Sequence, residues 1–358
     1  MPYQDIPTNV FSCLSNRPRE LLYSMITISD PPKLMESNLQ KRASSLGILD
    51  RLPVEVLHEV LRSLDFQSII RFSRVSIRGM NILYSLPAYR DVIKHVPHAL
   101  AALSQTKLLH LHSASELHNA LRAERCATCP EYGVYLFLPT CERRCWQCLR
   151  SNPTRRVISP TATAKTFVLS PKMVQKLPAM FSISGIYGIA CKSTQKSYRL
   201  VSVSASKELL MSIHGSAENA TEAIIRRKPN GDTAFTARYL RAVFSDSTCL
   251  DSLMMPDQGS IGVDRYFGMA SIPFSSLTTP DIVEHGLWCK GCEWTYKQYS
   301  SGRLSANVIA SMVPKNCHPD RVLFGMVRRA RSRIRLTAHI RHCYGAQQLL
   351  ADQGVQEG

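Results

Sequence analysis

The sequence predicts an α+β protein that is mainly helical, and three stretches of it lead to this fold class. Apolar residues recur at helical spacing at Val56, Val60 and Leu64, which places them on one face of an amphipathic helix. Residues 134–138 alternate and are rich in aromatic side chains, so we expect a strand of a small β-hairpin there. Residues 319–352 form a basic stretch that we expect to be one long helix.

Composition favours a soluble globular protein of two or three compact units. The 358 residues are 44% hydrophobic and 20% charged, which is ordinary for such proteins. The sequence has no run of about 18 apolar residues and no N-terminal secretory pattern. We therefore expect a cytoplasmic and/or nuclear protein that is neither secreted nor membrane-spanning. In that reducing environment, 12 cysteines indicate metal binding rather than disulfides.

The charge of the chain is strongly positive. Lysine and arginine number 44 against 27 acidic residues, a formal net charge of +17. Such a balance suits polyanionic partners, including nucleic acid and acidic proteins. The basic residues are mostly scattered, with local clusters only at 226–228 and 328–335. A solvated basic surface is the simplest interpretation, and the cluster at 328–335 would also suit nuclear import or an acidic partner.

Residues 1–45 contain five prolines and one short apolar run at 21–28, so a disordered tail is expected. Pro53 can open the first helix, because its missing N–H would have no partner there. A second short helix follows through Ile69 and Val75, and a third is expected at 77–85. Helices as short and apolar as the first two cannot bury their faces on each other alone. They are either part of a larger core or a docking surface for another protein.

These residues resemble an F-box. The run Leu52-Pro53-x-Glu55-Val56-Leu57 comes first, and Leu64, Ile69, Ser73 and Val75 follow in order. The stretches at 78–79 and 86–90 resemble the fungal branch of F-box proteins, with one departure at Gly79, where the commoner F-box has a large aromatic residue. The resemblance implies a three-helix module over residues 46–96 that docks on the Skp-type adaptor of cullin–RING ubiquitin ligases. The implied docking residues are Leu52, Pro53, Val56, Val60, Leu64, Ile69 and Val75.

Residues 97–155 combine helices with a predicted zinc module. Ser113 and Glu116 have the spacing of a capping box at the start of a helix that leads to Cys126. The frame Cys126-x2-Cys129-x15-Cys145-x2-Cys148 matches structural zinc sites, in which two Cys-x2-Cys pairs supply four thiolates to one ion. Cys141 is an alternative to Cys145 or Cys148 as a ligand, or a fifth, unligated thiol. The block also resembles the zinc module that follows the F-box in many fungal relatives.

Residues 156–284 carry weaker signals and are expected to be α+β. The Thr/Ala run at 161–166 suggests a linker, and Ser170 can cap a short helix that ends before Pro178. A strand is expected at 198–203. Helices are expected at 204–214, closed by Gly215, and at 220–227 and 234–244.

Residues 285–347 are expected to hold a second zinc site, followed by a tail at 348–358. Cys289 and Cys292 form another Cys-x2-Cys pair. His339 and Cys343 lie four residues apart, so on one helix both side chains can reach one ion. Together they give a Cys3His site. The alternatives are a redox Cys-x2-Cys pair and unrelated buried thiols; rival ligands are His285, Cys317, His318 and His342.

No enzyme motif for nucleotide, phosphate, serine-hydrolase or zinc-protease chemistry occurs in the sequence. Both predicted zinc sites have four protein ligands and no open position, so two structural ions are expected. The F-box resemblance implies a non-catalytic subunit that presents an unknown protein substrate to a ubiquitin ligase. The alternatives are a zinc-containing nucleic-acid-binding protein and an F-box protein that acts outside a ligase.

Overall fold

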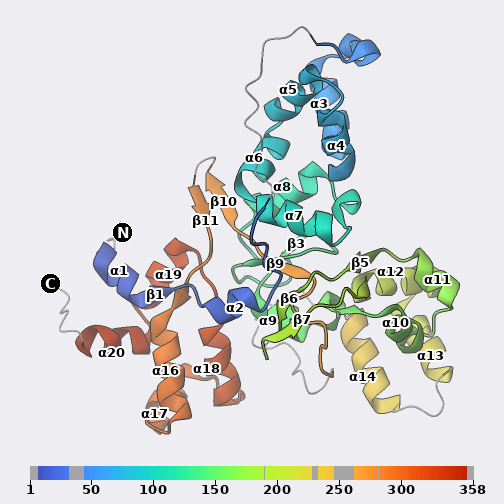
Figure 1. Ribbon diagram of the computed structural model, residues 1–358. Helices are drawn as coiled ribbons and strands as arrows, with labels where there is room; N and C mark the ends of the chain where they lie inside the picture. Colours follow the sequence, from blue (N-terminus) through green and yellow to red (C-terminus); the bar gives the residue numbers. More distant parts are fainter. Residues whose placement is uncertain are drawn as a thin grey trace.

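The computed structural model describes residues 7–31, 44–188, 190–227, 233–245, 262–279 and 282–352. These residues form the mainly helical α+β protein that the sequence predicts. Within them lie five small antiparallel sheets of two or three strands. A helical arm projects from a centre of small sheets, and one group of helices flanks the centre on each side (Figure 1).

The arm contains the predicted three-helix module. Its elements are η1 (Gly47–Arg51), α3 (Val54–Ser63), α4 (Phe66–Ser73), α5 (Ile77–Ser85) and α6 (Pro87–His95). Asp65 caps α4 by accepting a hydrogen bond from the Ser68 N–H, and Ser76 caps α5 in the same way through Gly79. Pro53 caps α3 with extended ψ and lies just before the helix instead of inside its first turn.

Gly79 lets α4 and α5 approach each other closely. A Cβ atom at this position would lie 3.2 Å from the Leu46 Cδ2 atom and 3.3 Å from the Phe72 Cε1 atom. Gly79 is therefore buried under Leu46 and Phe72, and these two side chains occupy the space that a large residue at 79 would need. The third helix therefore needs no large side chain at position 79, and its Tyr84 ring packs edge-to-face on Tyr89 of α6.

Three helical segments join the arm to the centre: α7 (Pro97–Gln105), η2 (Leu109–Leu111) and α8 (Ala114–Arg122). The predicted capping box at the start of α8 is confirmed, because the Glu116 N–H donates to Ser113 Oγ and the Ser113 N–H donates to Glu116 Oε2. One hydrophobic core runs from Phe66 through Val92 and Leu117 to Phe137. The arm is thus rigidly joined to the central sheet.

The central sheet has the order β3-β2-β9, formed by β3 (Glu142–Arg144), β2 (Tyr135–Phe137) and β9 (Ser271–Pro273). The hairpin β2–β3 is the predicted one, and Tyr135 pairs with Arg144. Strand β9 arrives from far along the chain and pairs with the other edge of β2. Helix α9 (Trp146–Ser151) and η3 (Pro153–Arg155) follow the hairpin.

The described residues between 157 and 244 form a second unit, whose helices share a core of their own while several of its strand residues pack into the main core. Its strands are β4 (Val157–Ile158), β5 (Ala179–Phe181), β6 (Gly185–Tyr187), β7 (Lys192–Thr194) and β8 (Arg199–Ser202). Its helices are α10 (Pro160–Phe167), α11 (Pro171–Lys176), α12 (Val203–His214), α13 (Ala217–Arg226) and α14 (Thr233–Phe244). The expected linker at 161–166 is wrong: Ser159 caps α10, and Thr163 and Phe167 are buried. The expected helices with Ser170 and Gly215 at their ends are present.

The C-terminal elements are β10 (Ser276–Thr279), β11 (Ile282–Glu284), β12 (Trp288–Cys289), α16 (Lys290–Ser300), α17 (Ala306–Met312), α18 (Pro319–Val327), α19 (Arg333–Ile340) and α20 (Tyr344–Asp352). The expectation of one long helix at 319–352 is wrong, since three helices occupy this range. Between α18 and α19 the backbone of Arg331 exchanges two hydrogen bonds with Leu287, which removes it from any helical ladder. Helix α20 also extends into the expected tail at 348–358.

The expected disordered tail at 1–45 is wrong for residues 7–31, which contain α1 (Thr8–Leu14), β1 (Ser15–Asn16) and α2 (Arg19–Tyr23). Strand β1 pairs with β12, so Ser15 faces Cys289. The Ile26 N–H donates to the Ser271 carbonyl at 2.9 Å, and Leu14 and Met25 are buried. The N-terminal segment is therefore bonded to the central sheet at β9 and forms a two-stranded sheet with β12 of the C-terminal unit. Residues 1–6 and 32–43 lie outside the described residues.

No described helix combines the length and the apolar character needed to cross a membrane.

Candidate metal centres and exposed apolar surface

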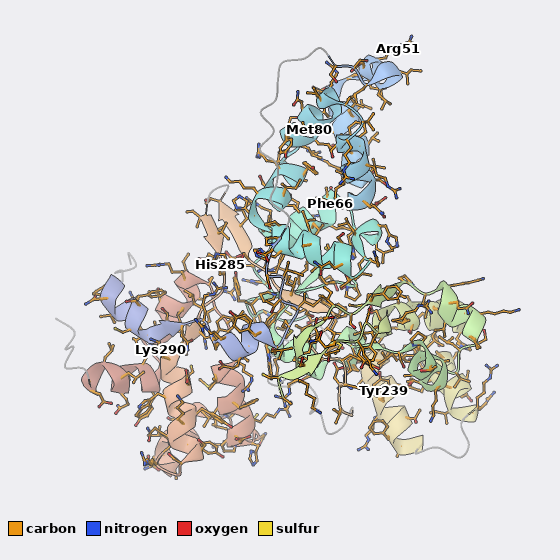
Figure 2. The ribbon with its side chains drawn as sticks, viewed as in Figure 1. Arg51, Phe66, Met80, Tyr239, His285 and Lys290 are labelled. Carbon is orange, nitrogen blue, oxygen red and sulfur yellow. The ribbon has the colours of Figure 1, made fainter. Side chains whose placement is uncertain are left out.

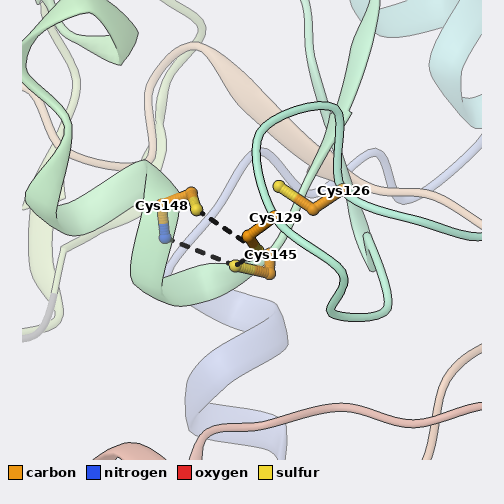
Figure 3. A group of neighbouring side chains, drawn as sticks. All are labelled: Cys126, Cys129, Cys145 and Cys148. Atoms are coloured by element: carbon orange, nitrogen blue, oxygen red, sulfur yellow. Dashed lines mark hydrogen bonds between the residues drawn. The ribbon is translucent and has the colours of Figure 1, made fainter. Parts of the chain in front are cut away.

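Four cysteines meet beside the β2–β3 hairpin and form the first cluster: Cys126, Cys129, Cys145 and Cys148. Their sulfur atoms all lie within 4.8 Å of one another, and the shortest separations are 3.5 Å and 3.6 Å, both to Cys129 (Figure 3). A tetrahedral zinc ion with Zn–S bonds of about 2.3 Å places its sulfur ligands about 3.8 Å apart. The cluster therefore fits a tetrahedral ion, and it is the set that the sequence predicts.

Local backbone contacts position these four thiols. In the first Cys-x2-Cys loop, the Cys126 N–H donates to the Glu131 carbonyl and the Ala127 N–H donates to the Arg143 carbonyl. Gly133 closes the loop where a Cβ atom would lie 2.9 Å from the Arg143 Cβ. In the second pair, Cys145 precedes α9 and its sulfur accepts from the Cys148 N–H. A helix N-terminus favours the negative charge that a metal-bound thiolate carries.

The pKa values of the Cys126, Cys129 and Cys145 thiols are strongly perturbed. Hydrogen bonds from Cys129, Cys145 and Cys148 lower the pKa of Cys126 far below its ordinary value. Hydrogen bonding to Cys126, together with complete burial, raises the pKa of Cys145. One buried thiolate is thus stabilised by its thiol neighbours, whereas four adjacent thiolates require a cation among them.

Arg143 supports the first cluster from the hairpin. Its buried guanidinium donates hydrogen bonds to the backbone carbonyls of Gly133, Ala120, Ser275 and Phe274. Burial lowers the pKa of Arg143 to about 10, so the side chain stays charged at neutral pH. One side chain thereby joins the first Cys-x2-Cys loop, α8 and the segment after β9.

Cys141 does not belong to the first cluster. It lies at the turn of the hairpin with a φ of 52° and is buried in the main hydrophobic core. Burial raises the pKa of its thiol above the ordinary value, so Cys141 is a neutral core residue. The alternative in which it replaces Cys145 or Cys148 has no support in the geometry.

The second cluster consists of Cys289, Cys292, His339 and Cys343, the predicted set. Cys292 Sγ lies 3.1 Å from His339 Nε2, and Cys289 Sγ lies 3.8 Å from Cys343 Sγ. The expectation that His339 and Cys343 share one helix is wrong, because α19 ends at Ile340 and Cys343 precedes α20. The turn between the two helices brings both side chains to the same point.

The rival ligands lie elsewhere. The His285 Nδ1 atom is 2.6 Å from the Ser275 hydroxyl, and Cys317 packs in a separate apolar group. His318 caps α18, and neither it nor His342 belongs to either cluster of the described residues.

Two features enclose the second cluster. Helices α16 and α20 cross at a pair of glycines: a Cβ on Gly345 would lie 2.1 Å from the Gly291 carbonyl oxygen. The N-terminal helix α1 packs Val10, Phe11 and Leu14 into the same apolar group as the cluster's cysteines. Nothing in the sequence patterns linked α1 to this site; its only signal was three apolar residues at helical spacing.

Most of the arginines at 328–335 connect the segment before the second cluster with residues around the first cluster. Arg329 forms an ion pair of 3.0 Å with Glu131, and Arg335 donates to the Pro130 carbonyl. Arg328 stacks over the rings of Phe324 and Trp146 at 3.3 and 4.7 Å from their centroids. Arg331 is buried. These contacts hold the C-terminal helices against the first Cys-x2-Cys loop and α9, so they give the basic run a structural role.

The arm carries an exposed apolar surface. Among the described residues, 14 large hydrophobic side chains are exposed, and seven of them lie within residues 48–75. We name this set the apolar arm surface: Ile48, Leu49, Leu52, Val54, Val56, Val60 and Val75. Ile48 and Val75 are more than 70% exposed. Such crowding of apolar residues on one projecting arm indicates a protein-binding surface.

The predicted docking residues divide into three groups. Leu52, Pro53, Val56, Val60 and Val75 are exposed on the arm, and Leu64 is half-buried. Ile69 is fully buried with Leu61 and Phe66 in the arm's own core. In this structure Ile69 therefore packs inside the arm and holds α4 in place, whereas the exposed members of the set are free to meet a partner.

Comparison with known families supports this interpretation of the arm. Residues 49–78 match the F-box domain family, a range that covers most of η1, all of α3 and α4, and the start of α5. No curated protein and no solved structure matches the chain. The arm therefore contains an F-box domain, whose general role is that of a non-catalytic adaptor of ubiquitin ligases that binds a Skp-type protein. The match covers residues 49–78 only.

Proposed function

We propose that this protein is the substrate-recruiting subunit of a cullin–RING ubiquitin ligase in the cytoplasm or nucleus. The apolar arm surface binds a Skp-type adaptor, and the remainder of the chain holds a target protein. The observation that carries the proposal is the exposure of Leu52, Val56 and Val60 inside the segment that matches the F-box family.

The shape of the molecule supports this division of roles. The arm points away from both metal modules, so an adaptor at its far end leaves the body accessible (Figure 1). Because one continuous core joins the arm to the central sheet, a target held on the body keeps a fixed position relative to the adaptor. Fixed placement of two reactants raises their effective concentration, which is the contribution that a non-catalytic subunit makes to transfer.

Zinc is the ion that best suits both clusters. Three or four thiolates with at most one imidazole are soft ligands, and a closed four-ligand set is typical of structural zinc. In this proposal the two ions replace much of the hydrophobic core that the small sheets lack. They stabilise the body and take no part in chemistry.

Co-purification from cells tests the proposal. The tagged full-length chain is expected to retain the Skp-type adaptor and cullin, whereas the double variant Val56→Asp, Val60→Asp is expected to lose both. Ile213→Asp, at a similarly exposed position on α12, is the matched control and is expected to bind like the wild type. Adaptor binding without ubiquitin transfer to any bound target would indicate an F-box protein that acts outside a ligase.

A further inference from the structure

A groove opens at the base of the arm, between the N-terminal segment, the junction of α6 and α7, and the chain after β9. Its volume is about 500 Å³. His285, labelled in Figure 2, lies between the arm above it and the C-terminal helices below it. We name this site the basic groove. Its lining includes Arg17, Tyr23, Lys94, His95, His98 and His285.

The lining of the basic groove carries positive charge and no negative charge. Arg17 and Lys94 are its cations, three histidines add ring nitrogens, and none of the seventeen described lining residues is aspartate or glutamate. Burial and the neighbouring Arg17 guanidinium both lower the pKa of His285, so the field of Arg17 reaches across the groove. A concave site lined by one sign of charge attracts ligands of the opposite sign.

The floor of the basic groove is apolar. Ile26, Ile28, Val96 and Phe274 are buried beneath it. At its rim the Tyr23 ring is 52% exposed. An exposed tyrosine beside an apolar floor is a typical anchor for a side chain of a protein partner.

We propose that the basic groove binds an extended acidic segment of a target protein, with carboxylates at its cationic rim and an apolar side chain on its floor. This inference rests on the proposed function, because it assigns the site that holds the target. A peptide suits the groove better than single-stranded nucleic acid, which needs successive aromatic platforms for its bases. Among the described lining residues, Tyr23 is the one exposed phenylalanine, tyrosine or tryptophan.

The position of the groove fits this role. Lys94, His95 and His98 come from the end of α6 and the start of α7, so the groove is built partly on the same rigid arm that carries the apolar arm surface. A target held there has a fixed relation to the adaptor. The N-terminal segment supplies Arg17 and Tyr23, so residues before the F-box complete the site.

The test uses the full-length zinc-loaded protein and an immobilised library of random octapeptides at low salt. Peptides retained by the wild type are expected to be enriched in aspartate and glutamate together with at least one apolar residue. The double variant Arg17→Gln, Lys94→Gln should bind the selected peptides about tenfold more weakly, because it removes two positive charges from the groove lining. Tyr23→Ala should weaken binding while leaving the acidic preference intact, which separates the contribution of the aromatic side chain from that of the positive charges.

Lys172→Ala, a remote exposed lysine on α11, is the matched control and should bind as the wild type does. Unfolding temperature and zinc content identify any variant that has lost its fold. Selected peptides without acidic enrichment, equal binding by the double variant, or displacement of the peptides by single-stranded RNA at lower concentration would overturn the proposal.

Adaptor binding is measured separately on the same variants. If the groove variants lose peptides and keep the Skp-type adaptor, both proposals stand. If peptides bind as described but the wild type fails to bind the adaptor, the proposed function fails and the groove remains. If the adaptor binds and the peptides show no acidic preference, the groove inference alone fails.

Discussion

The guanidinium of Arg335 donates a hydrogen bond of 2.8 Å to the backbone carbonyl of Pro130. Pro130 directly follows a cysteine of the first cluster, and Arg335 lies one helical turn before the histidine of the second. The ion pair of Arg329 with Glu131 is a second contact between the same two segments. The two Cys/His clusters therefore share no residue, and contacts at the Cys-x2-Cys loop of the first cluster connect them.

Metal content is the first prediction. The purified protein should carry about two zinc ions, one for each four-ligand set. Cys129→Ser and Cys292→Ser should each lose one ion, as measured by elemental analysis, and should lower the unfolding temperature because structural zinc contributes folding free energy. Cys141→Ser, at a core thiol outside both clusters, is the control and should keep both ions. A content of one ion in the wild type would contradict one of the two sites.

The N-terminal helix α1 should slow the release of zinc from the second cluster and have no effect on release from the first. Leu14→Asp places a carboxylate in the apolar group that covers Cys289 and Cys292, so zinc should leave this cluster faster when a chelator is added. A chromophoric chelator should report one fast-released ion and one slow ion. Ser12→Asp, on the exposed side of the same helix, should release zinc like the wild type. Uniform release from both clusters in Leu14→Asp would show that α1 has no specific role.

Arg143 should be indispensable for the first module. Arg143→Met leaves four buried backbone carbonyls without the donor they have in the folded protein. The free energy of unfolding should fall by about 3 kcal/mol or more, as measured by urea denaturation with zinc present. The same change at the exposed Arg122 of α8 should alter stability by less than about 0.5 kcal/mol. Equal effects at both positions would remove the assigned role of Arg143.

Variants of Ile69 and Val60 should distinguish a residue that packs in the core from a residue that binds the adaptor. Ile69→Ala creates a cavity beneath α4 and should cost about 2–5 kcal/mol of stability, while folded molecules keep their affinity for the adaptor. Val60→Ala should leave stability nearly unchanged and weaken adaptor binding. Denaturation curves and binding titrations on both variants give the comparison. The reverse pattern would mean that Ile69, not Val60, faces the partner.

Local sequence patterns were sufficient to predict much of the candidate site. Cys-x2-Cys spacing depends on short-range geometry, so both metal clusters could be predicted residue by residue. Capping residues such as Ser113 and Ser170 marked helix starts for the same reason. The apolar face of α3 followed from its period, but the period could not say which of its residues are exposed, or that Ile69 of α4 turns inward.

Long-range pairing could not be predicted in the same way. Strand β9 joins β2 across more than a hundred residues, and β1 pairs with β12 from the other end of the chain. These pairs form because buried backbone groups need partners, and no local motif identifies which distant segment supplies them. Arg331 breaks the expected long helix for this reason, since its backbone pairs with Leu287.

A binding titration of purified full-length protein with a purified Skp-type adaptor tests the central claim most directly. The account predicts saturable one-to-one binding by the wild type and by Ile213→Asp. It predicts at least about a hundredfold loss in Val56→Asp, Val60→Asp, since two charges would be buried in an apolar interface. Absence of binding by the wild type, or equal affinity of the double variant, would contradict it.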